Sequence, residues 1–214
     1  MGKDGGGQES STKSVHVYVA PDPALKPPEV VSVFLAGGIT NCPNWQAEFL
    51  SKLEGDFVVY NPRRENFPIG DPTSAKIQIE WEYERLKAAS AVVFWFSRGS
   101  LNPIVLYELG RWGTSSSDRP IFIGVDPEYA RKLDVEHQVA LAKPYTPVYD
   151  SLEVLATVVN EWAYKESRER PSVRRLAAAF YTLEVAEEHL REVRKQIALA
   201  LQPYRNGPDV NIHT

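Results

Sequence analysis

The chain has 214 residues, 43% of them hydrophobic and 24% charged, a composition typical of a globular protein with a sizeable core. Its net charge of -4 gives no reason to expect nucleic acid as a partner. Cys42 is the only cysteine, which excludes an intrachain disulfide and a Cys-rich metal site, and four scattered histidines argue against zinc. The N-terminus lacks the apolar core of a signal peptide, and no apolar run approaches the roughly 20 residues that span a bilayer. We therefore expect a cytoplasmic protein with no metal, no cofactor and no membrane contact.

Three regions follow from changes in composition along the chain. Residues 1–28 are rich in Gly, Ser and Pro and predict a flexible segment, with one short edge strand where residues 14–19 alternate with period two. Residues 29–165 alternate apolar runs with helical patterns and predict one α/β domain. Residues 166–214 predict a helical extension that ends in a polar tail.

The middle region predicts a doubly wound parallel sheet of about five strands. Its apolar runs lie at residues 30–36, 56–60, 91–96, 120–125 and, more weakly, 146–149. Helices are expected at residues 43–53, 73–89, after Pro103, from Pro127 with Asp126 as its cap, and at residues 151–165. Strands that are apolar throughout and alternate with helices indicate a parallel sheet covered on both faces. Ligands of such sheets bind beyond the carboxyl ends of the strands, at the topological switch point.

The C-terminal region carries a long apolar stripe. Its residues repeat at intervals of three and four, as on one face of a helix: Leu176, Phe180, Leu183, Leu190, Ile197 and Leu201. We expect a long amphipathic helix. Between packing on its own domain and packing on a second subunit, we favour the subunit contact, and hence a homo-oligomer.

Glu108 is the first candidate for chemistry. Asn102 is a preferred N-cap and Pro103 is tolerated at the first helical position, so a helix should begin there. Glu108 then lies in the second turn, inside an otherwise apolar run. It is either a structural acid favoured by the helix dipole or a carboxylate that faces a cleft.

Glu82 is the second candidate, in the helix predicted at residues 73–89. It shares a mainly apolar stripe with three residues at helical spacing: Ile79, Leu86 and Ala89. It is either a boundary residue that pairs with Arg85 or Lys87, or a second acid of the same cleft. Two carboxylates suit glycosyl chemistry, in which one attacks the anomeric carbon while the other handles the proton of the leaving group. An N-glycosidic bond fits this scheme because a nucleobase leaves well once it is protonated.

Further candidates for substrate binding lie at the predicted strand ends. Gly37 and Gly38 let a ligand approach the backbone closely, although a tight turn explains them equally well. Arg63, with its neighbour Arg64, can hold a phosphate or a substrate oxygen, or form an ion pair with Glu65 or Asp71.

Asp71 is the remaining polar candidate for substrate binding, in the loop before the second helix. Trp81 is an aromatic surface for stacking a base, although most such residues are core. Cys42 is a poor candidate for a nucleophile, because no His is predicted near it.

Five motifs, in order along the chain, resemble the nucleoside 2-deoxyribosyltransferase-like family. They are residues 34–39 (Phe-Leu-Ala-Gly-Gly-Ile), 61–64 (Asn-Pro-Arg-Arg), 79–82 (Ile-Glu-Trp-Glu), 93–96 (Val-Phe-Trp-Phe) and 102–110 (Asn-Pro-Ile-Val-Leu-Tyr-Glu-Leu-Gly). The resemblance implies a flavodoxin-like fold and a retaining double displacement at the anomeric carbon. It also implies that Glu108 is the nucleophile and that Glu82 handles the base.

Two features depart from that family. Its transferases carry an Asp, which helps to hold the sugar, at the position of Asn102. Asn can still hydrogen-bond a hydroxyl, so Asn102 stays a candidate for substrate binding, but its amide offers no charge and no proton acceptor. A neighbouring subunit's C-terminus completes their site, whereas this chain continues into its own long extension. Related members hydrolyse nucleoside 5′-monophosphates with a similar Glu.

The main hypothesis is an enzyme that cleaves the N-glycosidic bond of a (deoxy)nucleoside and passes the sugar from Glu108 to another base. Its partner is then a small-molecule nucleoside or nucleotide. One alternative is a nucleoside or nucleoside 5′-monophosphate hydrolase. The other is a nucleotide-binding sensor whose carboxylates do no chemistry and whose C-terminal helix relays occupancy to a partner.

Overall fold

The computed structural model describes residues 15–23, 30–55, 57–68, 70–113, 119–169, 187 and 189–199. The chain divides into two compact units, residues 1–169 and 170–214. Among the described residues, no helix has both the length and the apolar character required to cross a membrane. The expected flexibility of residues 1–13 lies outside the described residues.

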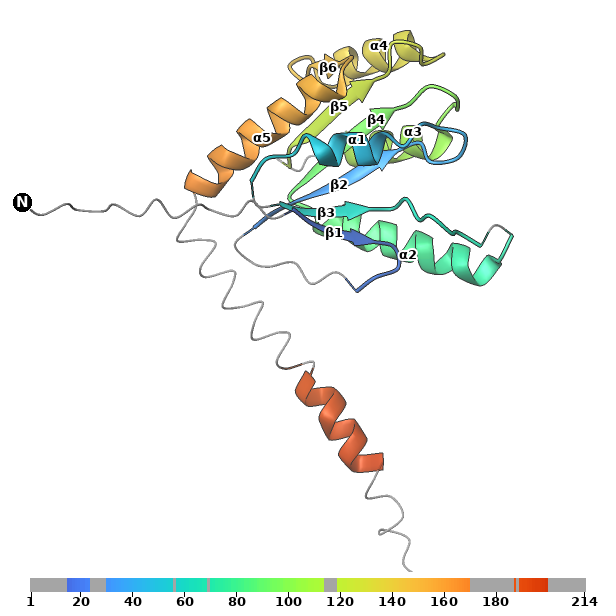
Figure 1. The fold of residues 1–214 in the computed structure, drawn as a ribbon, viewed down its shortest axis with the longest axis vertical. Coiled ribbons are helices and arrows are strands. Elements are labelled where there is room, and N and C mark those ends of the chain that lie inside the picture. Colours follow the sequence, from blue (N-terminus) through green and yellow to red (C-terminus); the bar gives the residue numbers. More distant parts are fainter. Residues whose placement is uncertain are drawn as a thin grey trace, which may run out of the picture. The chain divides into compact units, whose positions relative to one another are not determined.

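A six-stranded parallel sheet forms the centre of the first unit (Figure 1). Its strands are β1 (Val15–Val19), β2 (Val31–Gly37), β3 (Phe57–Asn61), β4 (Ala91–Phe96), β5 (Ile121–Val125) and β6 (Val148–Tyr149). They lie in the order β1-β3-β2-β4-β5-β6, and every neighbouring pair is parallel. The order from β3 to β6 is that of a flavodoxin-like sheet, whose switch point lies between β2 and β4. The predicted doubly wound sheet is confirmed, and β1 is the short edge strand.

Helices cover both faces of this sheet (Figure 1). They are α1 (Trp45–Ser51), α2 (Pro72–Ala88), α3 (Pro103–Glu108), α4 (Lys132–Ala142) and α5 (Leu152–Glu169). The side chains of each buried strand point alternately to the two faces. In β2, Phe34 packs in the core beneath α2, α3 and α4, and Leu35 packs in the core beneath α1 and α5. Strands buried on both sides need apolar residues throughout, which is the pattern that the sequence shows.

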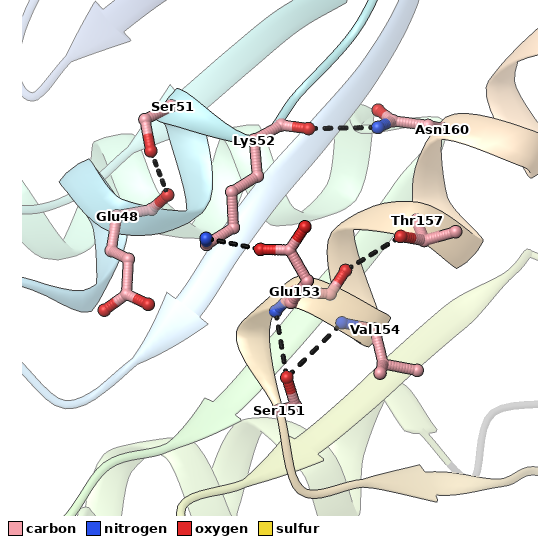
Figure 2. A network of polar contacts seen from close by, with 8 residues as sticks. All are labelled: Glu48, Ser51, Lys52, Ser151, Glu153, Val154, Thr157 and Asn160. Atoms are coloured by element: carbon pink, nitrogen blue, oxygen red, sulfur yellow. Dashed lines mark hydrogen bonds and ion pairs between the residues drawn. The ribbon is translucent and has the colours of Figure 1, made fainter.

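The end of α1 is fastened to α5 by polar contacts (Figure 2). The Asn160 side chain accepts a hydrogen bond from the Glu54 backbone N–H at 3.0 Å and donates one to the Lys52 carbonyl at 3.0 Å. Lys52 also forms an ion pair with the exposed Glu153. These contacts satisfy backbone groups at the end of a short helix, so they fix the position of α1 on the sheet.

Two predicted helix bounds were wrong. Asp126 does not cap a helix that starts at Pro127: its backbone and side-chain oxygens accept hydrogen bonds from Tyr129 and Glu128 in a turn, and α4 begins only at Lys132. The helix expected at residues 151–165 begins as predicted but continues to Glu169. Ser151 accepts hydrogen bonds from the first turn of α5, which explains its sharp start.

In the second unit, residues 187 and 189–199 are helical, which fits the predicted C-terminal helix. Leu176, Phe180, Leu183 and Leu201 lie outside the described residues, as does the polar tail. The homo-oligomer and the subunit contact stay predictions.

The Asn160→Ala variant should lower the free energy of unfolding by about 1–2 kcal/mol, because two backbone groups of the α1 end lose their partner. Chemical denaturation monitored by circular dichroism measures the loss. The matched control is Glu153→Gln, which removes only the ion pair of an exposed side chain and should have a much smaller effect. Equal losses for the two variants would show that Asn160 does not fasten α1.

Candidate functional site

A cavity of about 390 Å³ lies where the sheet topology places the switch point. Its walls come from the end of β2 and the loop after it, the residue after β3, the middle of α2, the loop that leads from β4 into α3, and α3 itself. The lining residues are Phe34, Ala36, Gly37, Gly38, Ile39, Thr40, Pro62, Glu82, Ser100, Asn102, Pro103, Ile104, Val105 and Glu108. Five of the predicted site residues therefore meet at one cavity: Gly37, Gly38, Glu82, Asn102 and Glu108.

Glu108 is the last residue of α3 and is only 9% exposed. The backbone after it widens into a π-helical turn, Leu109–Gly113. Departures of this kind from α-helical geometry are frequent at functional sites. Glu108 is thus a buried carboxyl that faces a cavity. An acid with a purely structural role at a helix start would instead be exposed to solvent.

Glu82 lies in the middle of α2, where its helix face meets the cavity. Gln78, one turn earlier, donates a hydrogen bond to Glu82 Oε1 at 2.7 Å. The predicted apolar stripe was wrong in one member, because Ile79 is 63% exposed. Trp81 and Leu86 form the buried side of the helix, and Glu82 lies at the edge of that side.

Burial raises the pKa of both acids. Loss of solvation, with a smaller contribution from the charge of Glu82, raises the pKa of Glu108 to about 8. Burial also raises the pKa of Glu82, and the hydrogen bond from Gln78 opposes that shift. At neutral pH the pair therefore holds a proton, with Glu108 as its principal carrier. Such a pair can supply a carboxylate and a proton to the same bound molecule.

Asn102 joins the loops that form the other wall of the cavity. Its Nδ2 donates to the Ser97 carbonyl at 2.9 Å and to the Ser100 carbonyl at 3.1 Å, and its Oδ1 accepts from the Cys42 thiol at 3.5 Å. As predicted, Asn102 is the N-cap residue of α3 and Pro103 is its first residue, and the Asn102 backbone carbonyl accepts a hydrogen bond from the Leu106 N–H at 3.1 Å. The Asn102 side chain, however, makes no hydrogen bond to the first turn of the helix. The residue has a left-handed backbone, φ 48° and ψ 51°, which Asn tolerates better than most residues.

Gly37 and Gly38 are required by the side chains packed against them. A Cβ on Gly37 would lie 2.2 Å from the Trp45 ring, and a Cβ on Gly38 would lie 1.9 Å from Asn102 Oδ1. The Gly38 carbonyl accepts a hydrogen bond from Trp45 Nε1 at 3.0 Å. This pair of glycines lets α1 and the Asn102 loop close on the end of β2, and so it shapes the cavity floor.

Three predicted substrate-binding residues do not line the cavity. The Arg63 guanidinium donates to the carbonyls of Cys42 and Pro43 and to the side chain of Gln46, so it fixes the loop between β2 and α1. Asp71 caps α2 by accepting hydrogen bonds from two backbone N–H groups. Trp81 is buried and donates from its indole N–H to a backbone carbonyl at 2.7 Å.

Gln78 was missed by the sequence analysis. Its signal was the interval of four residues to Glu82, which places the two side chains on one face of a helix. Thr40 and Ser100 also line the cavity, and no sequence pattern singled them out. In the described part of the chain, no group of three His, Cys, Asp or Glu side chains is arranged to hold a metal ion.

The segment that holds the cavity matches a known protein family. The family model described as nucleoside 2-deoxyribosyltransferase like matches residues 30–129, a stretch that contains every residue lining the cavity. Residues 30–129 form a nucleoside 2-deoxyribosyltransferase-like domain. No curated protein matches the chain. The match ends in the loop before α4, so β1, α4, β6 and α5 belong to the same unit but lie outside the matched segment.

The Gly38→Ala variant should destabilise the nucleoside 2-deoxyribosyltransferase-like domain by about 1–3 kcal/mol, because its methyl group overlaps Asn102 and Cys42. Thermal unfolding measures this. Gly110→Ala is the control, since a Cβ there meets nothing within 4 Å. A Gly38→Ala protein as stable as the Gly110→Ala protein would mean that the Asn102 loop does not need the glycine.

The Glu108→Gln variant should be more stable than the wild type at alkaline pH. Between the ordinary value of 4.5 and the folded pKa of about 8, folded Glu108 keeps a proton that the unfolded chain has lost. The wild type therefore loses stability as the pH rises through this window, whereas Gln cannot ionise.

The advantage of Glu108→Gln should grow from near zero at pH 4.5 to roughly 3–5 kcal/mol above pH 8. Urea denaturation at several pH values measures it. Glu80→Gln, the same replacement at an exposed position of α2, is the control. A pH-independent difference for Glu108→Gln would contradict the burial of this carboxyl.

Proposed function

We propose that this protein cleaves the N-glycosidic bond of an unphosphorylated nucleoside and transfers the sugar to another base through a glycosyl–Glu108 intermediate. The observation that carries the proposal is the meeting of two carboxyls, the buried Glu108 and the half-buried Glu82, in one cavity of a nucleoside 2-deoxyribosyltransferase-like domain. A pair that retains a proton supplies the two groups that a double displacement needs.

In the first step, the proton of the pair moves to Glu82, and a carboxylate oxygen of Glu108 attacks the anomeric carbon as the bond to the base breaks. The electron pair of that bond passes to the ring nitrogen of the base, which takes the proton from Glu82. The sugar is left as an ester of Glu108, and Glu82 is left as a carboxylate.

In the second step, a ring nitrogen of an incoming base attacks the same carbon and releases the Glu108 carboxylate. The proton of that nitrogen returns to the carboxyl pair, so the protein regains its starting state. Retention at the anomeric carbon follows from two successive inversions. Much of the wall is apolar, including Phe34, Ile39 and Ile104, which favours a planar base over water as the acceptor.

The charge of the cavity favours a nucleoside over a nucleoside 5′-monophosphate. Among the described residues, those that line the cavity include two acids, Glu82 and Glu108, and no Arg, Lys or His. The nearby Arg63 already donates to three oxygen atoms of the β2–α1 region. A phosphate would therefore lose hydration and gain no cation in exchange.

The test incubates the protein with deoxynucleosides, with their ribonucleoside counterparts and with 5′-monophosphates, each with and without a free acceptor base. Chromatography should show a new nucleoside from the unphosphorylated deoxynucleosides, and Glu108→Gln should lose at least about 10³-fold in turnover. Glu80→Gln, on the same domain, should retain full activity.

Free sugar in place of a new nucleoside would establish a hydrolase. Binding without release of base would establish a sensor. A Glu108→Gln protein with normal turnover would remove the nucleophile from the proposal.

A further inference from the structure

Gln78 lies behind Glu82 and is 8% exposed. Its Nε2 donates two hydrogen bonds, to the Pro62 carbonyl at 2.8 Å and to Glu82 Oε1 at 2.7 Å. Pro62 follows β3 and lines the cavity, so one amide group joins the wall formed by β3 to the acid carried by α2.

The orientation of this amide is fixed by the chemistry of its neighbours. The Pro62 carbonyl can only accept a hydrogen bond, so the NH₂ group must face it. The same NH₂ group then meets Glu82 Oε1. Gln78 Oε1 is buried and has no hydrogen-bond partner among the described protein atoms. An unpaired buried oxygen is costly. In this orientation, the two hydrogen bonds that Gln78 Nε2 donates compensate for the unpaired Oε1.

We propose that Gln78 is a positioning residue for Glu82: its amide, anchored on the Pro62 carbonyl, holds Glu82 Oε1 and leaves the second carboxylate oxygen to serve the base. The inference rests on the proposed function, since it assigns to Gln78 the orientation of the acid that handles the leaving base.

A second consequence concerns the sharing of the proton. A donated hydrogen bond stabilises the ionised form of Glu82 and opposes the effect of burial on its pKa. The charged group that faces Glu82 from a neighbouring element is Glu108 of α3, and Glu108 receives no such donor in the described structure. On the same helix, the Arg85 guanidinium lies over the Tyr60 ring, 5.8 Å from its centre. Gln78 thereby moves the pKa values of the two acids further apart, so that the pair with a single proton persists over a wider pH range.

The test replaces Gln78 with Met, which has a similar length and volume but no donor. In Q78M, the turnover number for base release should fall roughly ten- to a hundredfold, because Glu82 is free to turn away from the base. The acidic limb of the pH profile should move upward by about one pH unit, because Glu82 loses the donor that favours its ionised form. Q138M, the same replacement at an exposed residue of α4, is the matched control and should keep the wild-type profile.

A merely structural role would lower the melting temperature and leave both the turnover number and the acidic limb unchanged, and that result would overturn the proposal. If Q78M does not fold, Q78N serves in its place. Its amide is one methylene too short to span Pro62 and Glu82, so the shift should have the same sign.

A carboxyl titration by ¹³C NMR separates this proposal from the proposed function, because it needs no substrate. The pKa of Glu82 is compared between E108Q and E108Q/Q78M, with Glu108 unable to ionise in either. A higher pKa of Glu82 in the double variant supports the hydrogen bond even if the wild type releases no base from any nucleoside. Equal values would refute it even if the wild type is active.

Discussion

The partial removal of Glu82 and the nearly full removal of Glu108 from water at one cavity is the constraint on which the other features of the site depend. Burial of a carboxylate is unfavourable, and burial of two beside each other is more so, because their charges repel. The fold meets this cost by keeping a proton on the pair and by giving Glu82 a donor in Gln78. The parallel sheet supplies the place, since β2 and β4 end side by side there and the helices that follow β3 and β4 carry the two acids.

Asn102 shows how the same site is held together on its other side. Its amide donates to two backbone carbonyls, at Ser97 and Ser100, and a carboxylate could make neither bond. The presence of Asn, where the transferases that the sequence resembles carry Asp, therefore fits the local structure of this loop. With both N–H donors engaged, its Oδ1 is the atom that faces Gly38 and the Cys42 thiol. Any contact of Asn102 with a sugar hydroxyl would then be through a neutral acceptor.

Much of the fold could be predicted because each buried strand is apolar throughout and each is followed by a helical pattern. The failures concern polar side chains whose hydrogen-bond partners are not the ones that the sequence pattern suggests. The Asn102 side chain bonds to the loop after β4 and not to the first turn of α3, and the Arg63 side chain bonds to the loop before α1 and to Gln46 of α1. Asp126 closes a turn and starts no helix. Sequence spacing identifies which polar residues are available, but their partners depend on which loops the sheet brings together.

The sequence by itself determined the parallel sheet and the succession of strands and helices, because hydrophobic periodicity and helix signals are local properties of the chain. It also identified Glu82 and Glu108 as candidates for chemistry. The tertiary structure decided that Glu82 and Glu108 share a cavity, that Gln78 holds one of them, and that Arg63, Asp71 and Trp81 are engaged elsewhere. It also explains why residues 37 and 38 are glycines, since a side chain there would collide with atoms of Trp45 and Asn102. The physical reason is that desolvation and hydrogen bonding between elements depend on distances in space, which spacing along the sequence does not contain.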